Sequence, residues 1–171
     1  IQRTAEYVQS RGMACSVYGA QFLLDALYEA QQYEAALQLM AGTGLRSWYN
    51  MISMGSTITT EAWDNVFKPN LDWNHAWGAA AANLIGRRLM GITPLKPGFE
   101  EIDIQPQPGG LEYAYIKHPS PRGSIHLKMK RQPDGRYHLD LYIPANSRAR
   151  LTLPTTKQTL TLLPGRHHVR E

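Results

Sequence analysis

The sequence predicts an α+β protein of two domains, with helices in the first half and antiparallel strands in the second. Up to Met90, apolar residues recur at the three- and four-residue steps of amphipathic helices. After Gly91, ten of the eleven prolines separate short runs in which apolar and polar residues alternate, as in strands joined by turns. The 171 residues are enough for two small domains. We place the boundary between residues 92 and 93.

The first half is expected to consist of helical hairpins. Thr4–Ser10 is helix-like, and a longer amphipathic pattern extends from Ser16 to Gln32. Tyr33–Met40 repeats that pattern until Gly42 and Gly44 end it. The last two segments therefore predict one hairpin.

Two further helices are expected before the boundary. Ser47–Ser53 predicts a short helix with its first serine as N-cap, and Asn74–Met90 predicts a longer one. The small residues of Gly78–Ala82 should let a neighbouring helix approach closely. Between these helices, Gly55–Thr60 is rich in Ser, Thr and Gly, which predicts a loop that ends at Glu61.

The second half predicts a β-sandwich. Apolar and polar residues alternate over residues 125–130 and 137–143, and Asp134-Gly135 between them is a strong hairpin signal. Ala149–Leu153 and Leu160–Leu162 supply two more expected strands.

Composition excludes several functions. Eighteen Lys and Arg against fourteen Asp and Glu give a formal charge of +4, but the basic residues are scattered along the sequence. Nucleic acid binding is therefore not favoured. No apolar run approaches the roughly twenty residues of a membrane span.

The sequence gives no reason to expect a cofactor or a metal. Cys15 is the only cysteine, so an internal disulfide is impossible, and we expect it to be a buried apolar side chain. The pair His167 and His168 has no third ligand at a suitable spacing, and we expect it to be exposed.

Ring faces and titratable groups are concentrated in one segment of about thirty residues. It holds all four tryptophans, Trp48, Trp63, Trp73 and Trp77, together with Glu61, Asp64, Asp72, Asn74 and His75. An indole offers an apolar face to the C–H side of a sugar ring, while carboxylates and an imidazole bond hydroxyls and move protons. The segment therefore indicates a pocket that binds and cleaves sugars.

Several motifs in this region resemble the C-terminal part of bacterial α-L-rhamnosidases of glycoside hydrolase family 78. They are GSTITTEAWD at residues 55–64, Asn-His-x-x-Gly at 74–78, Gly-Ile-x-Pro at 91–94 and Pro-Gly-Phe at 97–99. Their order and spacing follow the family. The resemblance implies that the first domain is the final part of an (α/α)6 barrel of helical hairpins, followed by a β-sandwich.

The same resemblance implies an inverting hydrolase that removes terminal α-linked L-rhamnose from an oligosaccharide or glycoside. Glu61 falls on the general base, His75 on a histidine of the rhamnose pocket and Trp63 on a tryptophan expected to form a wall. Thr60 stands where the family often has Trp. The general acid belongs to an earlier motif that is absent from residues 1–54. This chain alone should be inactive and needs the upstream part of the same polypeptide.

Each of these residues also has a purely structural interpretation. Glu61 also suits the N-terminus of a helix, and His75 suits a bond to a carbonyl. Asp64, Asp72 and Asn74 either hold the pocket residues or cap local turns.

Two other functions are alternatives. One is a non-catalytic carbohydrate-binding or interaction module that binds through the sandwich, and the other is a helical-barrel glycosidase or phosphorylase of different specificity. Since the chain starts at Ile1 without Met, we read it as a fragment. Its uncovered apolar faces should make it self-associate. The compartment is undetermined, with a periplasmic or secreted parent favoured.

Overall fold

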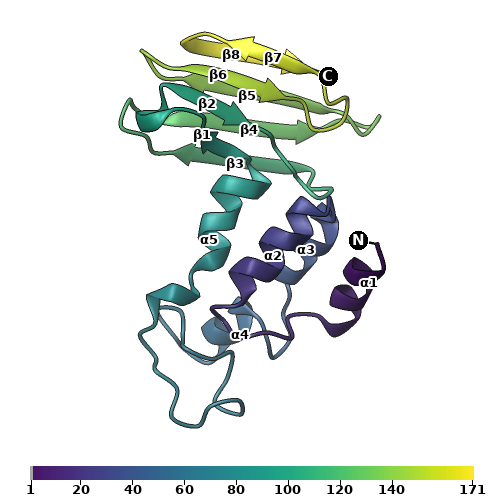
Figure 1. Ribbon diagram of the computed structural model, residues 1–171, viewed down its shortest axis with the longest axis vertical. Helices are drawn as coiled ribbons and strands as arrows, with labels where there is room; N and C mark the ends of the chain where they lie inside the picture. The colour runs from purple at the N-terminus through teal and green to yellow at the C-terminus, as the bar shows by residue number, and fades with distance from the viewer. Residues whose placement is uncertain (1) are drawn as a thin grey trace. The chain divides into compact units, whose positions relative to one another are not determined.

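The computed structural model describes residues 2–171, so expectations about Ile1 lie outside the described residues. The chain divides between Leu84 and Ile85 into two compact units (Figure 1). The first is helical and the second holds two four-stranded sheets, in agreement with the α+β expectation. The unit boundary precedes residue 92 because the turn at 85–89 packs against the first strand of the second unit.

Helices and loops make up the first unit. Its helices are α1 (Gln2–Arg11), α2 (Ala20–Glu29), α3 (Tyr33–Met40), α4 (Trp48–Ser53), the 3-10 turn η1 (Ala76–Gly78) and α5 (Ala80–Leu84). Helix α2 packs against both α3 and α5. Its buried residues Leu24 and Leu27 share the core with Ala36 and Leu84. The predicted hairpin of α2 and α3 is confirmed.

One predicted helix start differs from the structure, and another is confirmed. Helix α2 begins at Ala20 and not at Ser16, because the Ser16 hydroxyl accepts the N–H of Gly19 (3.0 Å) and caps a turn before the helix. Ser47 does cap α4, as predicted, by accepting the N–H of Asn50 (3.0 Å).

The expected helix Asn74–Met90 is divided into three pieces. It consists of η1, α5 and the π-helical turn η2 (Ile85–Leu89). The Gly78 carbonyl accepts the indole N–H of Trp48 (2.6 Å), which removes that carbonyl from a regular helix. At the other end the N–H of Met90 donates to the carbonyl of Ile85 (2.8 Å), a π-type bond.

The second unit contains eight strands. They are β1 (Ile92–Pro94), β2 (Glu101–Ile104), β3 (Tyr113–His118), β4 (Ile125–Arg131), β5 (Tyr137–Ile143), β6 (Arg148–Thr152), β7 (Thr159–Leu162) and β8 (Gly165–Arg170), with the 3-10 turn η3 (Pro97–Phe99) after β1. One sheet has the order β1-β2-β6-β7 and the other β3-β4-β5-β8. The predicted hairpin at Asp134-Gly135 is confirmed, and Gly135 adopts φ +85° in its turn.

The sheets are not wholly antiparallel, which corrects the prediction. Strands β2 and β6 pair in parallel, with Ile102 opposite Ala149 and Ile104 opposite Leu151. Parallel neighbours need a long connection, and here β3, β4 and β5 intervene in the chain. Strand β8 was not predicted, because Val169 is its only large apolar residue.

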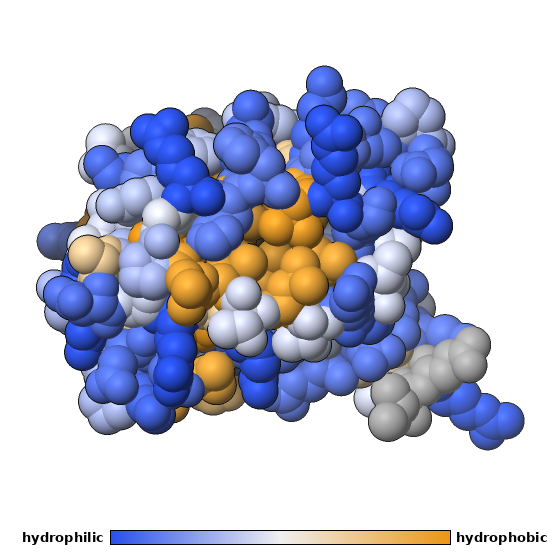
Figure 2. All heavy atoms as spheres, turned by 90° about the horizontal axis from the view of Figure 1, so that it is seen from above, coloured by the Kyte–Doolittle hydropathy of each residue, from blue (hydrophilic) through white to orange (hydrophobic). Residues whose placement is uncertain are grey.

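Each strand of the central pairs buries alternate residues. Ile125, Leu127 and Met129 of β4 and Leu139 of β5 are at most 1% exposed, whereas the residues between them face outward. The core of this unit is therefore built from the inward residues of the strands. On the surface seen from above in Figure 2, apolar side chains also gather in one patch between hydrophilic ones.

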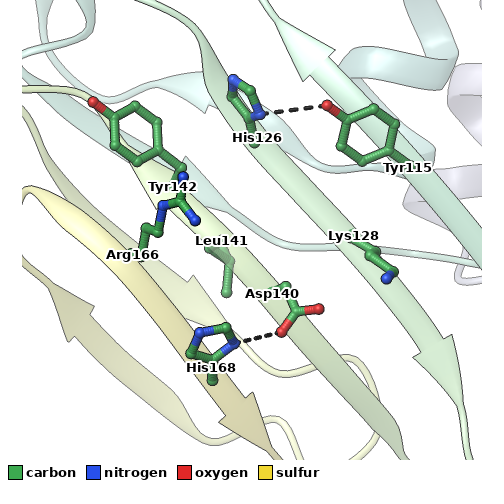
Figure 3. Close-up of a pocket in the computed structure, with 8 residues that line it drawn as sticks. All are labelled: Tyr115, His126, Lys128, Asp140, Leu141, Tyr142, Arg166 and His168. Atoms are coloured by element: carbon green, nitrogen blue, oxygen red, sulfur yellow. Dashed lines mark hydrogen bonds and ion pairs between the residues drawn. The ribbon is translucent and has the colours of Figure 1, made fainter.

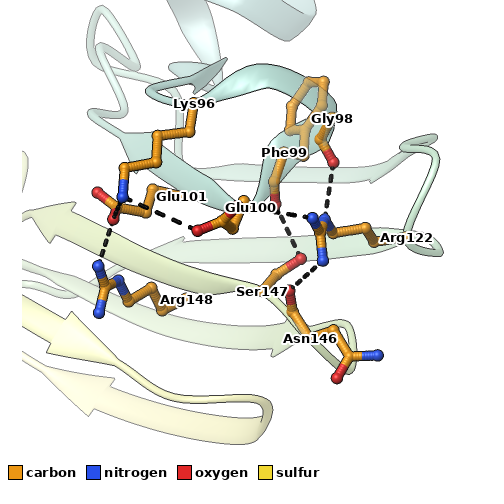
Figure 4. A network of polar contacts seen from close by, with 9 residues as sticks. All are labelled: Lys96, Gly98, Phe99, Glu100, Glu101, Arg122, Asn146, Ser147 and Arg148. Atoms are coloured by element: carbon orange, nitrogen blue, oxygen red, sulfur yellow. Dashed lines mark hydrogen bonds and ion pairs between the residues drawn. The ribbon is translucent and has the colours of Figure 1, made fainter.

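A polar network fastens the loops at one end of the second unit (Figure 4). Arg122 donates to the carbonyls of Gly98 (3.0 Å) and Asn146 (2.7 Å), and the Ser147 hydroxyl donates to the carbonyl of Phe99 (2.9 Å). These bonds satisfy the hydrogen-bonding capacity of backbone carbonyls that lie in turns, outside the paired strands of the sheets.

Candidate functional site

The candidate residues lie in the long loop that joins α4 to η1. Two stretches of this loop run side by side: the N–H of His75 donates to the carbonyl of Thr59 (2.9 Å), and the Thr59 hydroxyl donates to the carbonyl of His75 (2.7 Å). One step along, the N–H of Glu61 donates to the carbonyl of Asp72 (2.9 Å). This pairing places Glu61 and His75 on neighbouring stretches.

Glu61 presents an ionised, partly exposed carboxylate. No helix begins at this residue, so it is not a helix N-terminal acid. Its side chain is 30% exposed and forms an ion pair with Lys68, and its second oxygen accepts the N–H of Asp72 (3.1 Å). The bond from Lys68, followed by that from Asp72, lowers the pKa of Glu61. The carboxylate is therefore deprotonated at neutral pH, as a general base requires.

His75 is oriented by its neighbours on both sides. Its Nδ1 lies 3.5 Å from Oδ2 of Asp72, and its ring meets the Trp77 indole edge to face at 5.4 Å. The other Asp72 oxygen accepts the N–H of Asn74 (2.9 Å), and this bond is the main cause of the lowered pKa of Asp72. Asp72 thus caps a local turn and contacts the imidazole at the same time.

Trp63 and Asp64 hold the loop in place. The Trp63 side chain is 2% exposed, donates its indole N–H to the carbonyl of Cys15 (2.7 Å) and packs edge to face on Trp48 at 5.1 Å. This burial does not support the expected role of Trp63 as a pocket wall. Asp64 accepts the Asn50 side-chain amide (2.9 Å) and the N–H of Val66 (3.0 Å), which fastens the loop to α4.

Of the four tryptophans, Trp73 and Trp77 have the most accessible rings. Trp73 is 43% and Trp77 is 71% exposed, and Trp77 also lies 5.9 Å from the ring of Tyr18. Thr60, where the family often has Trp, is fully buried and donates to the carbonyl of Ala62 (2.7 Å). Trp77 therefore has the most exposed indole of the four tryptophans.

Two features of this region, the Lys68–Glu61 ion pair and the exposure of Trp77, were not predicted from the sequence. Nothing in the pattern marked Lys68 as the partner of Glu61, because the two are joined only by the folding of the loop. Trp77 was identified among the four tryptophans but was not singled out, and it lies in a 3-10 turn where a regular helix was expected.

Cys15 and the two C-terminal histidines each contact neighbouring groups or are partly buried. Cys15 is partly buried, and burial raises the pKa of its thiol. His168 contacts Asp140 (2.7 Å) and His167 contacts the carbonyl of Leu163 (2.7 Å). Among residues 2–171, no group of three or more His, Cys, Asp or Glu could hold a metal ion. Nor does any described helix have the length and apolarity to cross a membrane.

Two family descriptions cover nearly the whole chain. Residues 2–89 match the bacterial alpha-L-rhamnosidase 6 hairpin glycosidase domain, and residues 91–167 match the bacterial alpha-L-rhamnosidase C-terminal domain. The chain belongs to the bacterial α-L-rhamnosidase family. The junction of the two matched rhamnosidase domains lies at the end of η2, close to the change from helices to strands.

Curated relatives of this chain are named alpha-L-rhamnosidases. An alpha-L-rhamnosidase of Alteromonas sp. (strain LOR) is 27% identical over 144 residues, and one of Formosa agariphila is 26% identical over 146 residues. Each match covers 80% of this chain but 16% of the relative. The chain therefore spans about a sixth of the length of these rhamnosidases.

Solved rhamnosidase structures share the fold. The α-L-rhamnosidase of Aspergillus terreus superposes with a TM-score of 0.87 over 99% of this chain and 21% of that one, at 23% identity. The Streptomyces avermitilis enzyme, solved in complex with L-rhamnose, gives 0.80 over 98% of this chain and 19% of that one, at 18% identity. These similarities concern the fold alone.

Proposed function

We propose that this chain is the C-terminal part of an inverting α-L-rhamnosidase in which Glu61 is the general base. The helical unit would be the last hairpins of an (α/α)6 barrel, and the two sheets would form the β-sandwich after it. The upstream part of the polypeptide would complete the barrel and supply the general acid.

The observation that carries this proposal is the polar, ionised state of Glu61 beside His75. A general base must be deprotonated when water attacks, and Lys68 and the Asp72 N–H both favour the carboxylate form. In an inverting enzyme the acid stands roughly 6.5–9.5 Å from the base, which leaves room for that water. The partly exposed Glu61 carboxylate is accessible to it.

His75 and Trp77 would contact the sugar. The His75 imidazole, 29% exposed and held by Asp72, is suited to bond a hydroxyl of rhamnose. Trp77, 71% exposed and packed edge to face on His75, offers an apolar ring face to the C–H side of the sugar. In this proposal Trp77 takes the place that we first expected for Trp63.

The test is turnover by the full-length parent with Glu61→Gln. This variant keeps the size and hydrogen-bonding capacity of the side chain but cannot accept a proton, so hydrolysis of an aryl α-L-rhamnoside should fall about 10²-fold or more. Glu34→Gln, on the exposed surface of α3, is the matched control and should retain activity. Full activity in the Glu61 variant would refute the assignment of the base.

A further inference from the structure

The outer face of the sheet β3-β4-β5-β8 concentrates positive charge. The outward side chains of these strands include five cations, which together form a surface that we call the basic face: Lys117, Lys128, Lys130, Arg166 and Arg170. The four strands contain one carboxylate, that of Asp140. Five cations against one carboxylate leave four positive charges, as many as the formal net charge of the whole chain, +4. Basic residues that are scattered in the sequence are therefore gathered by strand pairing.

The strand register explains how they come together. Lys128 lies opposite Asp140, which in turn lies opposite His168, and Tyr142 lies opposite both His126 and Arg166. Because neighbouring strands are about 4.8 Å apart, the four strands make a continuous polar surface about 14 Å wide. The opposite side chains of the same strands form the core, so the register is fixed.

Part of the basic face is hollowed (Figure 3). A depression of about 430 Å³ is lined by tyrosine rings, histidines, cations and Asp140, and a second of about 250 Å³ shares Lys128, Asp140 and His168 with it. Tyr115 and Tyr142 stand on either side of His126, at 6.3 and 5.6 Å between ring centroids. The two hollows together form an extended track with accessible ring faces.

We propose that the basic face binds an acidic polysaccharide, one that bears carboxylate or sulfate groups. Lys128 and Arg166 would bond the anionic groups by charge-assisted hydrogen bonds, and Tyr115 and Tyr142, which are 52% and 39% exposed, would stack on the sugar rings. Asp140, held by His168 at 2.7 Å, would accept bonds from sugar hydroxyls.

Charge and family together favour a glycan over the other polyanions. The central Asp140 carboxylate can accept hydrogen bonds from the many free hydroxyls of a glycan, whereas the sugar–phosphate backbone of DNA has none within the chain. The chain also belongs to a family of glycosidases. The site lies outside the Glu61 loop, so it does not depend on the catalytic proposal.

The test compares polyanions by affinity electrophoresis of the full-length parent. The probes are polygalacturonate for carboxylates, dextran sulfate for sulfates, neutral dextran, and single-stranded DNA. Polygalacturonate or dextran sulfate should retard the protein, and neutral dextran should not. The acidic polymer that causes the stronger retardation identifies the anionic group, carboxylate or sulfate. Equal retardation by neutral dextran, or tighter binding of DNA than of either acidic glycan, would overturn the proposal.

Paired variants assign the binding to this face. Lys128→Gln with Arg166→Gln should weaken binding of the acidic glycan about tenfold or more, the loss expected for one charge-assisted hydrogen bond. Arg136→Gln with Lys157→Gln removes the same charge from turns of the same unit and should leave binding nearly unchanged. Hydrolysis of an aryl α-L-rhamnoside checks that both double variants fold. Equal binding by the two would overturn the proposal, whatever the role of Glu61.

Discussion

Glu61 and Asp72 are joined by two reciprocal hydrogen bonds between their stretches of loop. The N–H of Glu61 donates to the carbonyl of Asp72 at 2.9 Å, and the N–H of Asp72 donates to the Glu61 carboxylate at 3.1 Å. Asp72 thereby fixes the backbone of the proposed base, orients its carboxylate and contacts His75. The proposed base and the proposed sugar ligand are held by the same residue.

Lys68 should set the pH at which Glu61 becomes active. Its ion pair is the largest cause of the lowered pKa of Glu61, so Lys68→Met should raise that pKa toward its ordinary value. A general base is active when deprotonated, and therefore the acidic limb of kcat/KM in the parent should move to higher pH. Lys68→Arg keeps the positive charge, so the acidic limb should stay at the pH of the wild type. A pH profile that is identical in wild type and Lys68→Met would show that Lys68 does not act on the base.

Two tryptophans should separate stability from binding. Trp63 is 2% exposed and Trp77 is 71% exposed. Trp63→Ala should lower the free energy of unfolding by about 3–5 kcal/mol through the cavity it leaves. Trp77→Ala should change it by no more than about 0.5 kcal/mol while it raises KM for an aryl α-L-rhamnoside. Thermal unfolding and kinetics of the parent measure both. An unaltered KM in Trp77→Ala would remove this ring from the sugar site.

Gly91 and Gly98 form a matched pair for backbone crowding. Both adopt a left-handed conformation, with φ +68° and +66°. A Cβ at Gly91 would lie 1.9 Å from the carbonyl oxygen of Gln105, whereas one at Gly98 meets nothing within 4 Å. Gly98→Ala should cost about 1–2 kcal/mol of conformational strain, and Gly91→Ala several kcal/mol more. Thermal midpoints of the two variants compare them, and equal midpoints would contradict the crowding.

Glu171 should make the second unit less stable in acid. Burial alone would raise its pKa, but bonds from the N–H groups of Thr155, Thr156 and Tyr137 outweigh it and lower the pKa below 4.5. Because the pKa of Glu171 is lower in the folded than in the unfolded state, the ionised carboxylate stabilises the fold at pH values above the unfolded-state pKa. This contribution is lost as the pH falls through the folded-state pKa.

Hydrogen exchange of the strand amides in the parent measures this effect, after correction for intrinsic rates. Protection around Tyr137 should decline below pH 4.5 in wild type. Glu171→Gln should show lower protection at pH 7 and a weaker decline in acid. Parallel declines in the two proteins would exclude Glu171 as the cause.

Much of the fold followed from local patterns, and the exceptions have physical causes. Periodicity predicted α3 at its observed ends and Ser47 as the cap of α4. It failed at residues 74–90, where the bond from Trp48 to the Gly78 carbonyl interrupts the helix, a tertiary contact that no local pattern reveals. The parallel pairing of β2 with β6 is likewise a long-range choice.

The candidate site was predictable to a similar extent. The motif directed attention to Glu61 and His75, and the structure places both on paired stretches of one loop. The motif carries no signal of which indole is buried, so the 2% exposure of Trp63 and the 71% exposure of Trp77 were not predicted. Lys68 was missed because an ion pair across a folded loop has no signal in residue spacing.

The central claim, that Glu61 activates the attacking water, is tested most directly by azide rescue of the full-length parent with Glu61→Ala. Azide is a nucleophile that needs no base, and it fits the space left by the carboxylate. The account predicts that azide restores cleavage of an activated aryl α-L-rhamnoside and yields β-L-rhamnosyl azide, the product of inversion. An α-configured azide, or undiminished hydrolysis without azide, would contradict it.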